Sequence, residues 1–368
     1  MEKCERVKHE GVVTMRLLLL VGWIRLASPT TLTYTNPVLA EDFPDPAVVR
    51  TANGTFVAYA TGGGSPRSNI QCATSPDLVS WTMQPDALPE MPKWACSSCS
   101  RSVAPDVQLH GGVYFMYFSA YRASDNKTNC IGVATSSNAT GPFDGEPDPI
   151  VCDDRRGCAM DPRSYDAADG SLYLYYGSHH DPIMALRLDA SRLRAAANAA
   201  VAVPTVRPDA SSYGELVEAP WTYTDATGAL TMLYSGSQCC GADAHYAVMA
   251  ARSLESASDP AGGQQQQQQQ PLGPWTKLGG PDGSQSVILE ASTARQVTAP
   301  GHCAVVRDDE GVDWLVYHAM ACPSNASASC PRELFIDRLY YNRSWGGSDT
   351  WPWTAGPTSN EREAPRFF

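Results

Sequence analysis

The chain has 368 residues, of which 43% are hydrophobic and 18% are charged, and it contains 29 glycines and 28 prolines. This composition is typical of a packed protein with many turns, and it argues against a disordered chain or a long helical bundle. The 39 acidic residues outnumber the 27 lysines and arginines, which gives a formal net charge of -12 at pH 7. Because such a chain offers no basic surface for phosphate groups, we expect no nucleic-acid partner.

An apolar run occupies residues 17–24 near the N-terminus, between Arg16 and Arg25. A membrane span needs about 20 apolar residues, so this run is too short to cross a bilayer and is more typical of a secretion signal. We therefore predict that residues 1–30 are a secretion signal or an unstructured leader, that the protein is secreted, and that it has no membrane partner. An N-terminal strand is the alternative interpretation of the run.

Twelve cysteines and five Asn-X-Ser/Thr sequons also favour an extracellular, disulfide-bonded glycoprotein. Removal of the leader takes Cys4 away and leaves 11 of the twelve cysteines, so at least one should lie free or pair outside the chain. Cys239 and Cys240 are adjacent, and because a bond between neighbours strains the peptide, we expect each to pair elsewhere. Two other pairs are close enough in sequence to close small loops: Cys152 with Cys158, and Cys322 with Cys330.

One segment of the chain recurs five times. Each copy has a short apolar strand, a tight turn with glycine, and a second strand rich in aromatic and β-branched residues, which is the pattern of a β-hairpin. The second strands carry tyrosines at positions 59, 117, 175, 234 and 317, so the spacings are 58, 58, 59 and 83 residues. The longest spacing contains residues 256–274, a low-complexity insertion with seven consecutive glutamines at 264–270.

A period of about 58 residues accommodates four strands of about six residues with their connections. Five such sheets around one axis leave only short, protected edges. The sequence therefore predicts an all-β, five-bladed β-propeller that forms a single domain over residues 34–368, with the insertion at 256–274. A β-sandwich is less favoured because it does not require a fivefold repeat. The only conspicuous helix-prone stretch, residues 190–203, is expected to connect two blade strands.

Each copy of the repeat begins with an ionisable residue. These residues are Asp45, Asp106, Asp161, Glu218 and His302. If they begin the innermost strands, they converge at one end of the central channel. Crowding and burial raise the pKa of at least one carboxyl group, while a neighbour in a better hydrogen-bonded place stays charged. A protonated carboxyl and an ionised carboxylate in one pocket form the pair that hydrolyses a glycosidic bond with inversion.

Five motifs in a fixed order carry a resemblance to a known family. They are Asn36-Pro37-Val38-Leu39 with Phe43-Pro44-Asp45-Pro46, Ala104-Pro105-Asp106-Val107, Met160-Asp161-Pro162-Arg163, Val217-Glu218-Ala219-Pro220-Trp221, and Pro300-Gly301-His302. Together they resemble the motifs of family 43 glycoside hydrolases, which are inverting arabinanases, α-L-arabinofuranosidases and β-xylosidases on a five-bladed propeller. The resemblance implies that Asp45 is the general base, that Glu218 is the general acid, and that Asp161 raises the pKa of the acid and orients it.

Other residues are candidates for binding the substrate or a cation. The resemblance implies that His302 helps to hold a cation or an ordered water near the sugar, and that Arg332 contacts substrate hydroxyls. Phe43 and Trp221 would offer apolar faces to sugar rings, with ordinary strand packing as the alternative, and Asp106 is a further substrate-binding candidate. We expect that no cofactor is required, while calcium or another cation in the central channel, with His302 as a ligand, stays open.

The sequence thus predicts an inverting glycoside hydrolase that cleaves arabinose- or xylose-containing polysaccharide or oligosaccharide of plant or algal cell walls, and that acts as a monomer. Inversion requires roughly 6.5 to 9.5 Å between the two carboxyl groups, with room for a water. Two alternatives stay open: a catalytically silent propeller that binds carbohydrate or protein, and a retaining propeller glycosidase that acts on fructosides. The histidines show no HExxH spacing, which argues against a metal-dependent hydrolase.

Overall fold

Short antiparallel strands make up nearly all of the regular structure in the computed structural model of this chain. The structure describes residues 32–63, 67–99, 103–152, 159–177, 180–197, 202–241, 243–253, 270–279, 286–321, 330–344 and 350–368. Within these ranges the only helix is one 3-10 turn, Thr293–Arg295, and no helix is long and apolar enough to span a membrane. The predicted leader, residues 1–30, and most of the predicted insertion, residues 256–274, lie outside the described residues.

The strands form five antiparallel sheets, or blades, that follow one another in chain order. Blade 1 contains β2 (Ala47–Arg50), β3 (Phe56–Thr61), β4 (Ile70–Ser75) and β5 (Thr82–Gln84). Blade 2 contains β6 (Val103–His110), β7 (Val113–Tyr121), β8 (Asn129–Ser136), β9 (Asp144–Gly145) and β10 (Val151–Cys152). Blade 3 contains β11 (Met160–Asp166), β12 (Leu172–Gly177), β13 (Met184–Leu188) and β14 (Val203–Pro204).

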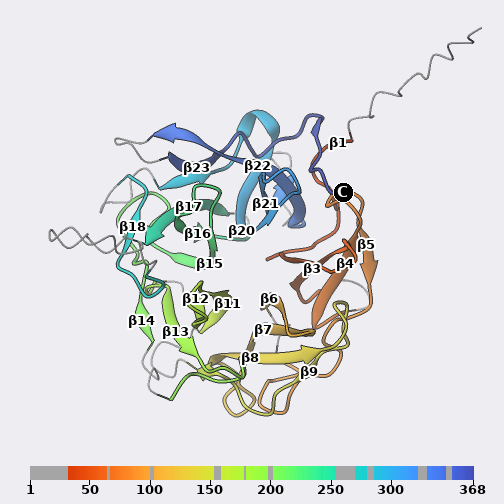
Figure 1. The fold of residues 1–368 in the computed structure, drawn as a ribbon, viewed down its shortest axis with the longest axis vertical. Coiled ribbons are helices and arrows are strands. Elements are labelled where there is room, and N and C mark those ends of the chain that lie inside the picture. Colours follow the sequence, from red (N-terminus) through yellow and green to blue (C-terminus); the bar gives the residue numbers. More distant parts are fainter. Residues whose placement is uncertain are drawn as a thin grey trace, which may run out of the picture. The chain divides into compact units, whose positions relative to one another are not determined.

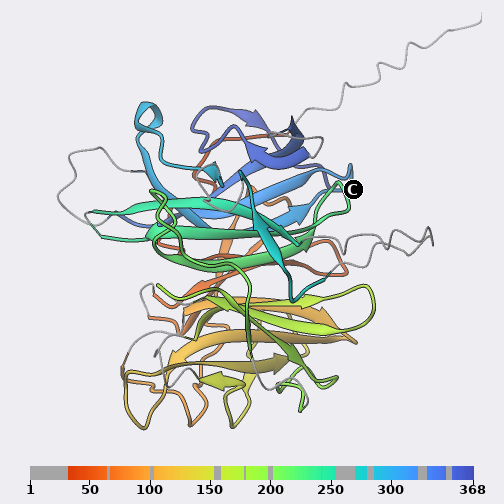
Figure 2. The same ribbon diagram turned by 90° about the vertical axis from the view of Figure 1, so that its left-hand side faces the viewer.

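Blades 4 and 5 complete the ring, and blade 5 holds the two longest strands. Blade 4 contains β15 (Val217–Thr224), β16 (Leu230–Gln238), β17 (His245–Ser253), β18 (Trp275–Lys277) and β19 (Val287–Leu289). Blade 5 contains β20 (Val297–Arg307), β21 (Asp313–Ala321), β22 (Glu333–Ser344) and β23 (Thr350–Thr354). Figure 1 shows the five blades around a common centre, and Figure 2 shows them from the side. The first strands, β2, β6, β11, β15 and β20, contact one another in a closed ring, so the predicted five-bladed propeller is confirmed.

The repeated hairpins supply both the turns and the packing between strands. The hairpin of blade 1 turns at Gly54, whose φ of 87° lies in a region that residues with a Cβ seldom adopt. The five repeated tyrosines are all fully buried: Tyr59, Tyr117, Tyr175, Tyr234 and Tyr317. The hydroxyl of Tyr117 donates to the carbonyl of Arg192 at 3.0 Å, and that of Tyr175 donates to the carbonyl of Pro271 at 2.6 Å. These two rings therefore bury a large apolar area while their polar ends keep a partner, whereas the buried hydroxyl of Tyr234 has no hydrogen-bond partner among the described residues.

An N-terminal segment links the last blade to the first. β1 (Thr33–Tyr34) pairs with β24 (Arg362–Glu363) near the C-terminus. The side chain of the buried Asn36 accepts the backbone N–H of Ile336 at 2.9 Å and donates to its carbonyl at 2.7 Å. It also donates to Thr358 Oγ1 at 3.2 Å. Asn36 therefore satisfies both backbone groups of one β22 residue, as a neighbouring strand would.

We expect Asn36→Ala to lower the free energy of unfolding by about 2–4 kcal/mol, because it leaves the buried N–H and carbonyl of Ile336 without partners. Urea unfolding followed by tryptophan fluorescence would measure the loss. The matched control is Asn138→Ala at an exposed turn, where we expect a change of less than about 0.5 kcal/mol. Equal stability of the Asn36→Ala variant and the unsubstituted protein would contradict the assignment.

The structure corrects two expectations about local structure. Residues 190–197 form turns and a bridge between Leu188 and Ala195, so the predicted helix is wrong in this part of the stretch, and residues 198–201 lie outside the described residues. Cys239 and Cys240 form a disulfide with each other, which the adjacency argument had disfavoured. Both cysteines follow Gln238, the last residue of β16, where the chain leaves the sheet.

The other cysteines also differ from the sequence expectation. Cys152 pairs with Cys130 and not with Cys158, because β10 and β8 place the two residues directly opposite each other. A further disulfide joins Cys96 and Cys99, and Cys330 is also disulfide-bonded, while Cys322 lies outside the described residues. Within the described part of the chain, the buried Cys72 and Cys303 are free, which agrees with the expectation of at least one unpaired thiol.

Candidate active site

An irregularity recurs at the first strand of every blade, within the strand in blades 2 to 5 and just before it in blade 1. At this point a non-glycine residue adopts a positive φ, a conformation that costs energy and is common at functional sites. In four blades it directly precedes a proline: Asp45 (φ 58°), Ala104 (φ 49°), Asp161 (φ 53°) and Ala219 (φ 55°). In blade 5 both Ala299, which also precedes a proline, and His302 have positive φ, of 47° and 45°. These left-handed residues re-aim the chain at the same place in each innermost strand.

A side chain of the preceding blade accepts the backbone N–H of a left-handed residue in four of the blades. His318 Nδ1 accepts from Asp45 at 3.0 Å, and Thr61 Oγ1 accepts from Ala104 at 2.9 Å. The same contact joins Ser119 to Asp161 at 3.1 Å, and Ser235 to His302 at 2.8 Å. The second strand of one blade therefore anchors the strained start of the next blade.

Blade 3 departs from this pattern, and the departure makes room for Glu218. Its second strand places Gly177 where blade 2 has Ser119, so no side chain is available to the next blade. A Cβ at Gly177 would lie 2.8 Å from the Cα of Glu218. The carboxylate of Asp161 takes over and accepts the N–H of Ala219 through Oδ2 at 3.1 Å. Asp161 therefore orients the backbone that carries Glu218.

The sequence suggested that the five leading residues occupy equivalent positions, but in the structure they do not. Asp45 and Asp161 occupy the left-handed position, but Ala104 and Ala219 hold it in blades 2 and 4. Glu218 lies one residue earlier than that position, and Asp106 lies two residues later. Aligning the copies on the prolines that follow would have revealed this shift.

Asp106 consequently has other partners. Its carboxylate accepts hydrogen bonds from Arg163 Nη1 at 2.8 Å, from the N–H of Ser164 at 2.8 Å and from its hydroxyl at 2.5 Å. The Asp106 side chain is only 2% exposed. It forms a buried ion pair with Arg163, and this arrangement does not favour its predicted contact with substrate.

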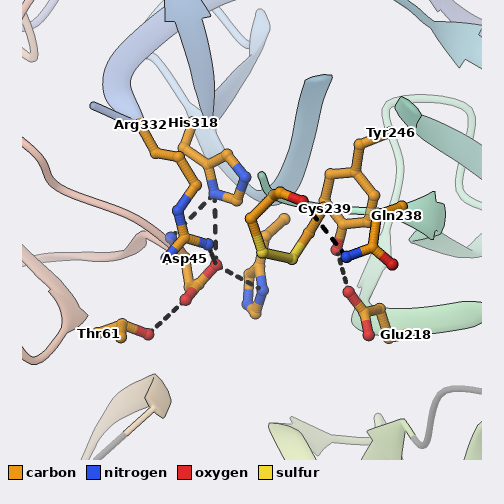
Figure 3. Close-up of a disulfide and its surroundings, with 10 residues drawn as sticks. Asp45, Thr61, Glu218, Gln238, Cys239, Tyr246, His318 and Arg332 are labelled. Carbon is orange, nitrogen blue, oxygen red and sulfur yellow. Dashed lines mark hydrogen bonds and ion pairs between the residues drawn. A yellow bond between two sulfur atoms is a disulfide. The ribbon is translucent and has the colours of Figure 1, made fainter. Parts of the chain in front are cut away.

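Asp45 lies among groups that stabilise a negative charge (Figure 3). Arg332 Nη1 is 3.0 Å from Oδ1, and the hydroxyl of Thr61 donates to Oδ2. The Nδ1 atoms of His302 and His318 lie 3.5 Å and 3.4 Å from Oδ1. Burial opposes ionisation of Asp45, but Arg332 first, then His302 and the hydroxyl of Thr61, outweigh it and hold its pKa well below the usual range. His318 adds no charge, because its Nδ1 accepts the Asp45 N–H and burial lowers its own pKa well below the usual value. Asp45 is therefore a carboxylate at any ordinary pH.

The pKa values of Glu218 and Asp161 are shifted in the opposite direction, upward. Burial raises the pKa of Glu218 to about 7, with the charge of Asp45 adding to the effect and the hydrogen bond from Tyr246 opposing it. Burial also raises the pKa of Asp161; His302 opposes this shift, and the charges of Glu218 and Asp45 add to it. The site therefore holds one ionised carboxylate beside carboxyl groups that keep a proton to a higher pH than usual.

The predicted aromatic contacts look different in the structure. Phe43 is fully buried within the hydrophobic core, and Trp221 is 7% exposed. The guanidinium of Arg163 lies 3.5 Å from the centre of the Trp221 ring. This arrangement favours strand packing for both rings, and their contact with sugar stays a prediction.

A cavity of about 420 Å³ adjoins Arg332. The disulfide of Cys239 and Cys240 lies beside the residues that surround Asp45, between Arg332 and Tyr246 in Figure 3. The residues that line the cavity are Asp42, Cys240, Gly241, Met320, Cys330, Pro331 and Arg332. Because Arg332 also contacts Asp45, the cavity lies next to the proposed base, and its volume is in the range of small-ligand sites.

Sequence reasoning missed several residues of the site. Thr61, Ser119, Ser235 and His318 each follow a repeated tyrosine by one or two residues, so counting from the tyrosines would have found them. Tyr246, which donates to Glu218 Oε1 at 2.7 Å, carries no such signal. Its position comes only from the pairing of β16 with β17.

The described residues contain no group of three or more His, Cys, Asp or Glu side chains that could together hold a metal ion. His302, the predicted ligand, faces Asp45. These residues alone do not form the donor set of a cation site, so we derive no chemical step through a cation, and the predicted ion stays a prediction.

Comparison with known proteins adds independent findings. The profile of "Glycosyl hydrolases family 43" matches residues 34–345. "Extracellular endo-alpha-(1->5)-L-arabinanase 2" of Bacillus subtilis is 27% identical over 175 residues, which are 39% of this chain and 34% of that protein. The chain thus spans about a third of the length of this curated relative.

Two further proteins match most of the chain. "Extracellular exo-alpha-(1->5)-L-arabinofuranosidase ArbA" of Cellvibrio japonicus is 24% identical over 332 residues, which are 84% of this chain and 86% of that protein. Among solved structures, a "thermostable family-43 glycoside hydrolase" has a TM-score of 0.71 at 23% identity and covers 90% of this chain and 99% of its own. The latter match supports the propeller fold.

Proposed function

Because the chain belongs to glycosyl hydrolases family 43, we propose that it hydrolyses O-glycosidic bonds with inversion in arabinose- or xylose-containing polysaccharide or oligosaccharide. One observation carries the proposal: Asp45 is held ionised, while burial raises the pKa of Glu218, and Arg332, which binds Asp45, lines an adjoining cavity. We place α-(1→5)-linked arabinan first among the substrates, because the curated relatives are named for this linkage.

In the proposed reaction, Asp45 and Glu218 act on opposite sides of the scissile bond. The Asp45 carboxylate takes a proton from a water, whose oxygen attacks the anomeric carbon. Protonated Glu218 gives its proton to the glycosidic oxygen as the bond to the anomeric carbon breaks. One water is consumed, and the attack inverts the anomeric configuration.

Asp161 acts through Glu218 in this proposal. Repulsion between the two charges disfavours ionisation of Asp161 and Glu218 together, and the bond from the Ala219 N–H to Asp161 fixes the backbone that carries Glu218. Arg332 holds Asp45 and lines the cavity, so it is also proposed to contact sugar hydroxyls.

We also propose that the protein is secreted. The apolar run at 17–24, the twelve cysteines of the chain and the relatives named as extracellular support this placement. Its proposed partner is cell-wall polysaccharide of plants or algae, and the monomeric state stays a prediction.

The test is an incubation of the purified protein with debranched arabinan, arabinoxylan and xylo-oligosaccharides, with products separated by size. We expect release of arabinose or arabino-oligosaccharides. Proton NMR during the first minutes should show the β-anomer from an α-linked substrate, before mutarotation equilibrates the two forms. Retention of configuration would favour the fructoside-type mechanism, and binding without turnover would favour the silent propeller.

A further inference from the structure

Tyr246 contacts the proposed acid, yet the reaction described above does not use it. It lies in β17, is 1% exposed, and its ring stacks on His318 with centroids 5.9 Å apart and planes at 8°. A Cβ on Gly301 would lie 2.1 Å from Cδ1 of this ring, so the neighbouring strand admits only glycine here. The phenol is therefore held in one place, with its hydroxyl 2.7 Å from Glu218 Oε1 (Figure 3).

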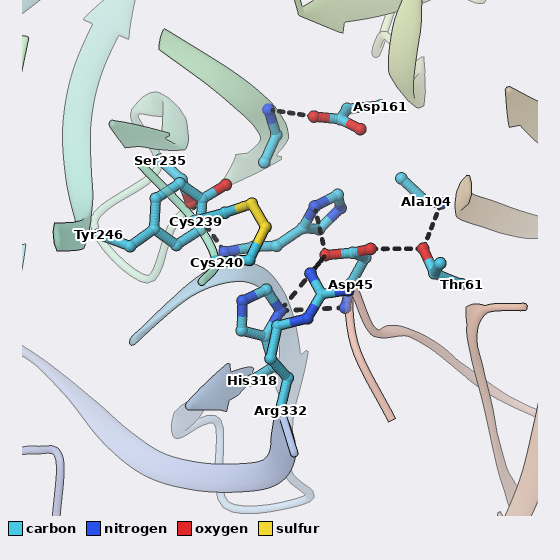
Figure 4. Close-up of polar contacts among 12 residues, drawn as sticks. Asp45, Thr61, Ala104, Asp161, Ser235, Cys239, Cys240, Tyr246, His318 and Arg332 are labelled. Atoms are coloured by element: carbon cyan, nitrogen blue, oxygen red, sulfur yellow. Dashed lines mark hydrogen bonds and ion pairs between the residues drawn. A yellow bond between two sulfur atoms is a disulfide. The ribbon is translucent and has the colours of Figure 1, made fainter. Parts of the chain in front are cut away.

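A second buried hydroxyl, that of Ser235, acts on the hydroxyl of Tyr246. The backbone N–H of His302 donates to Ser235 Oγ at 2.8 Å. Because a backbone N–H can only donate, Ser235 accepts there and keeps its own hydroxyl hydrogen to donate, and Ser235 lowers the pKa of Tyr246 against the effect of burial. Tyr246 in turn donates to Glu218 Oε1. Figure 4 shows Ser235 and Tyr246 beside the disulfide and the Asp45 group.

We infer that Tyr246 is a positioning residue that determines which oxygen of Glu218 delivers the proton. A neutral carboxyl group has one oxygen that carries the proton and one that only accepts hydrogen bonds. Since Tyr246 donates to Oε1, the proton is held on Oε2, which accepts no hydrogen bond from any described residue. This inference rests on the proposed role of Glu218 as the acid.

The hydrogen bond from Tyr246 to Glu218 strengthens as the reaction proceeds. When the proton leaves Oε2 for the glycosidic oxygen, Glu218 becomes a carboxylate, and its bond to Tyr246 becomes charge-assisted. Tyr246 remains a donor throughout, because burial and then the charges of Glu218 and Asp161 raise its pKa well above the usual value. Tyr246 would therefore lower the barrier of proton transfer and leave substrate binding nearly unchanged.

The test is Tyr246→Phe, which removes the hydroxyl and keeps the ring that stacks on His318. On arabino-oligosaccharides we expect kcat to fall about tenfold with KM unchanged within about twofold. On an aryl arabinofuranoside whose phenol leaves without protonation, we expect a fall of less than about twofold. Because the lost bond favoured ionised Glu218, its pKa should rise, and the basic limb of the pH profile should move to higher pH.

Tyr117→Phe is the matched control, since it removes a buried hydroxyl that donates to a carbonyl in blade 3. It should leave kcat and KM on both substrates, and the pH profile, unchanged. Ser235→Ala is the second variant. It should lower kcat on arabino-oligosaccharides about threefold and leave kcat on the aryl arabinofuranoside nearly unchanged. If Tyr246→Phe does not fold, the kinetics of Ser235→Ala test the inference in its place. Equal losses on both substrates, or an unmoved basic limb, would overturn the inference.

A measurement without turnover separates this inference from the proposed function. Carbon-13 NMR of labelled glutamate side chains, with Glu218→Gln to assign the signal, follows the titration of Glu218 directly. We expect a higher pKa of Glu218 in Tyr246→Phe than in the unsubstituted protein, and an equal pKa would overturn the inference. An unsubstituted protein without activity on any of the tested glycosides would instead refute the proposed function.

Discussion

Glu218→Gln is expected to lower kcat on arabino-oligosaccharides by about a thousandfold, because the amide cannot donate a proton to a poor leaving group. On an aryl arabinofuranoside with a good leaving group, the loss should be less than about tenfold. Steady-state kinetics on both substrates measure the difference. Glu361→Gln is the control, because this carboxylate is exposed and accepts a hydrogen bond only from Thr33 among the contacts of the described residues.

The same substitution should not weaken the fold at neutral pH. The folded pKa of Glu218, about 7, lies above its unfolded value of 4.5, so the unfolded chain loses this proton first as pH rises. Between these values rising pH favours the unfolded chain, and above about pH 7 the full cost of burying the charge is present. Glu218→Gln removes this cost, so its melting temperature at pH 8 should equal or exceed that of the unsubstituted protein.

The pH profile of the unsubstituted protein has a matching expectation. The proposed mechanism requires protonated Glu218, so the basic limb should fall as pH rises through about 7. Full activity at pH 9 on arabino-oligosaccharides would contradict Glu218 as the acid.

Asp45→Asn is expected to lower kcat by at least about a thousandfold on every substrate, whatever its leaving group, because no group is left to take the proton of the attacking water. Azide is a nucleophile that needs no deprotonation, so adding it should restore part of the turnover. The product should be a glycosyl azide of inverted configuration, which NMR identifies. A loss confined to poor leaving groups would contradict Asp45 as the base.

Unlike Glu218, Asp45 contributes stability as an ion. The folded pKa of Asp45 lies below its unfolded value of 3.8, so its stabilisation is present above that value and is lost as pH falls through the folded pKa. At pH 7 Asp45→Asn leaves Arg332 without its carboxylate partner, and we expect a loss of about 3 kcal/mol. Kinetics must therefore be measured well below the melting temperature of the variant. Asp169→Asn, at an exposed hairpin turn, is the control for both readouts.

The repeat explains why the fold was predictable. The tyrosine spacings of 58 and 59 residues record blades of equal size, and each buried tyrosine packs at the same place in its hairpin. A pattern that depends on local periodicity is visible in a single sequence. The disulfide of Cys130 and Cys152 was not visible, because it depends on the register of β8 and β10.

The site was predictable only in part, and the reason is its strained backbone. The sequence alone determined that acidic residues recur at the start of each copy, which led to Asp45, Asp161 and Glu218. It did not show that the left-handed position in blades 2 and 4 belongs to Ala104 and Ala219. Asp106 lies two residues beyond that position, where Arg163 and Ser164 bind its carboxylate.

Only the tertiary structure decided which uncharged or distant residues serve the carboxyl groups. His318 reaches Asp45 because blade 5 closes the ring against blade 1, across 273 residues of sequence. Tyr246 reaches Glu218 because β17 lies beside β16 in the same blade. The sequence by itself determined the number of blades and the carboxyl groups, because both repeat along the chain. The protonation of those groups depends on burial and on partners from other strands, and these exist only once the ring is closed.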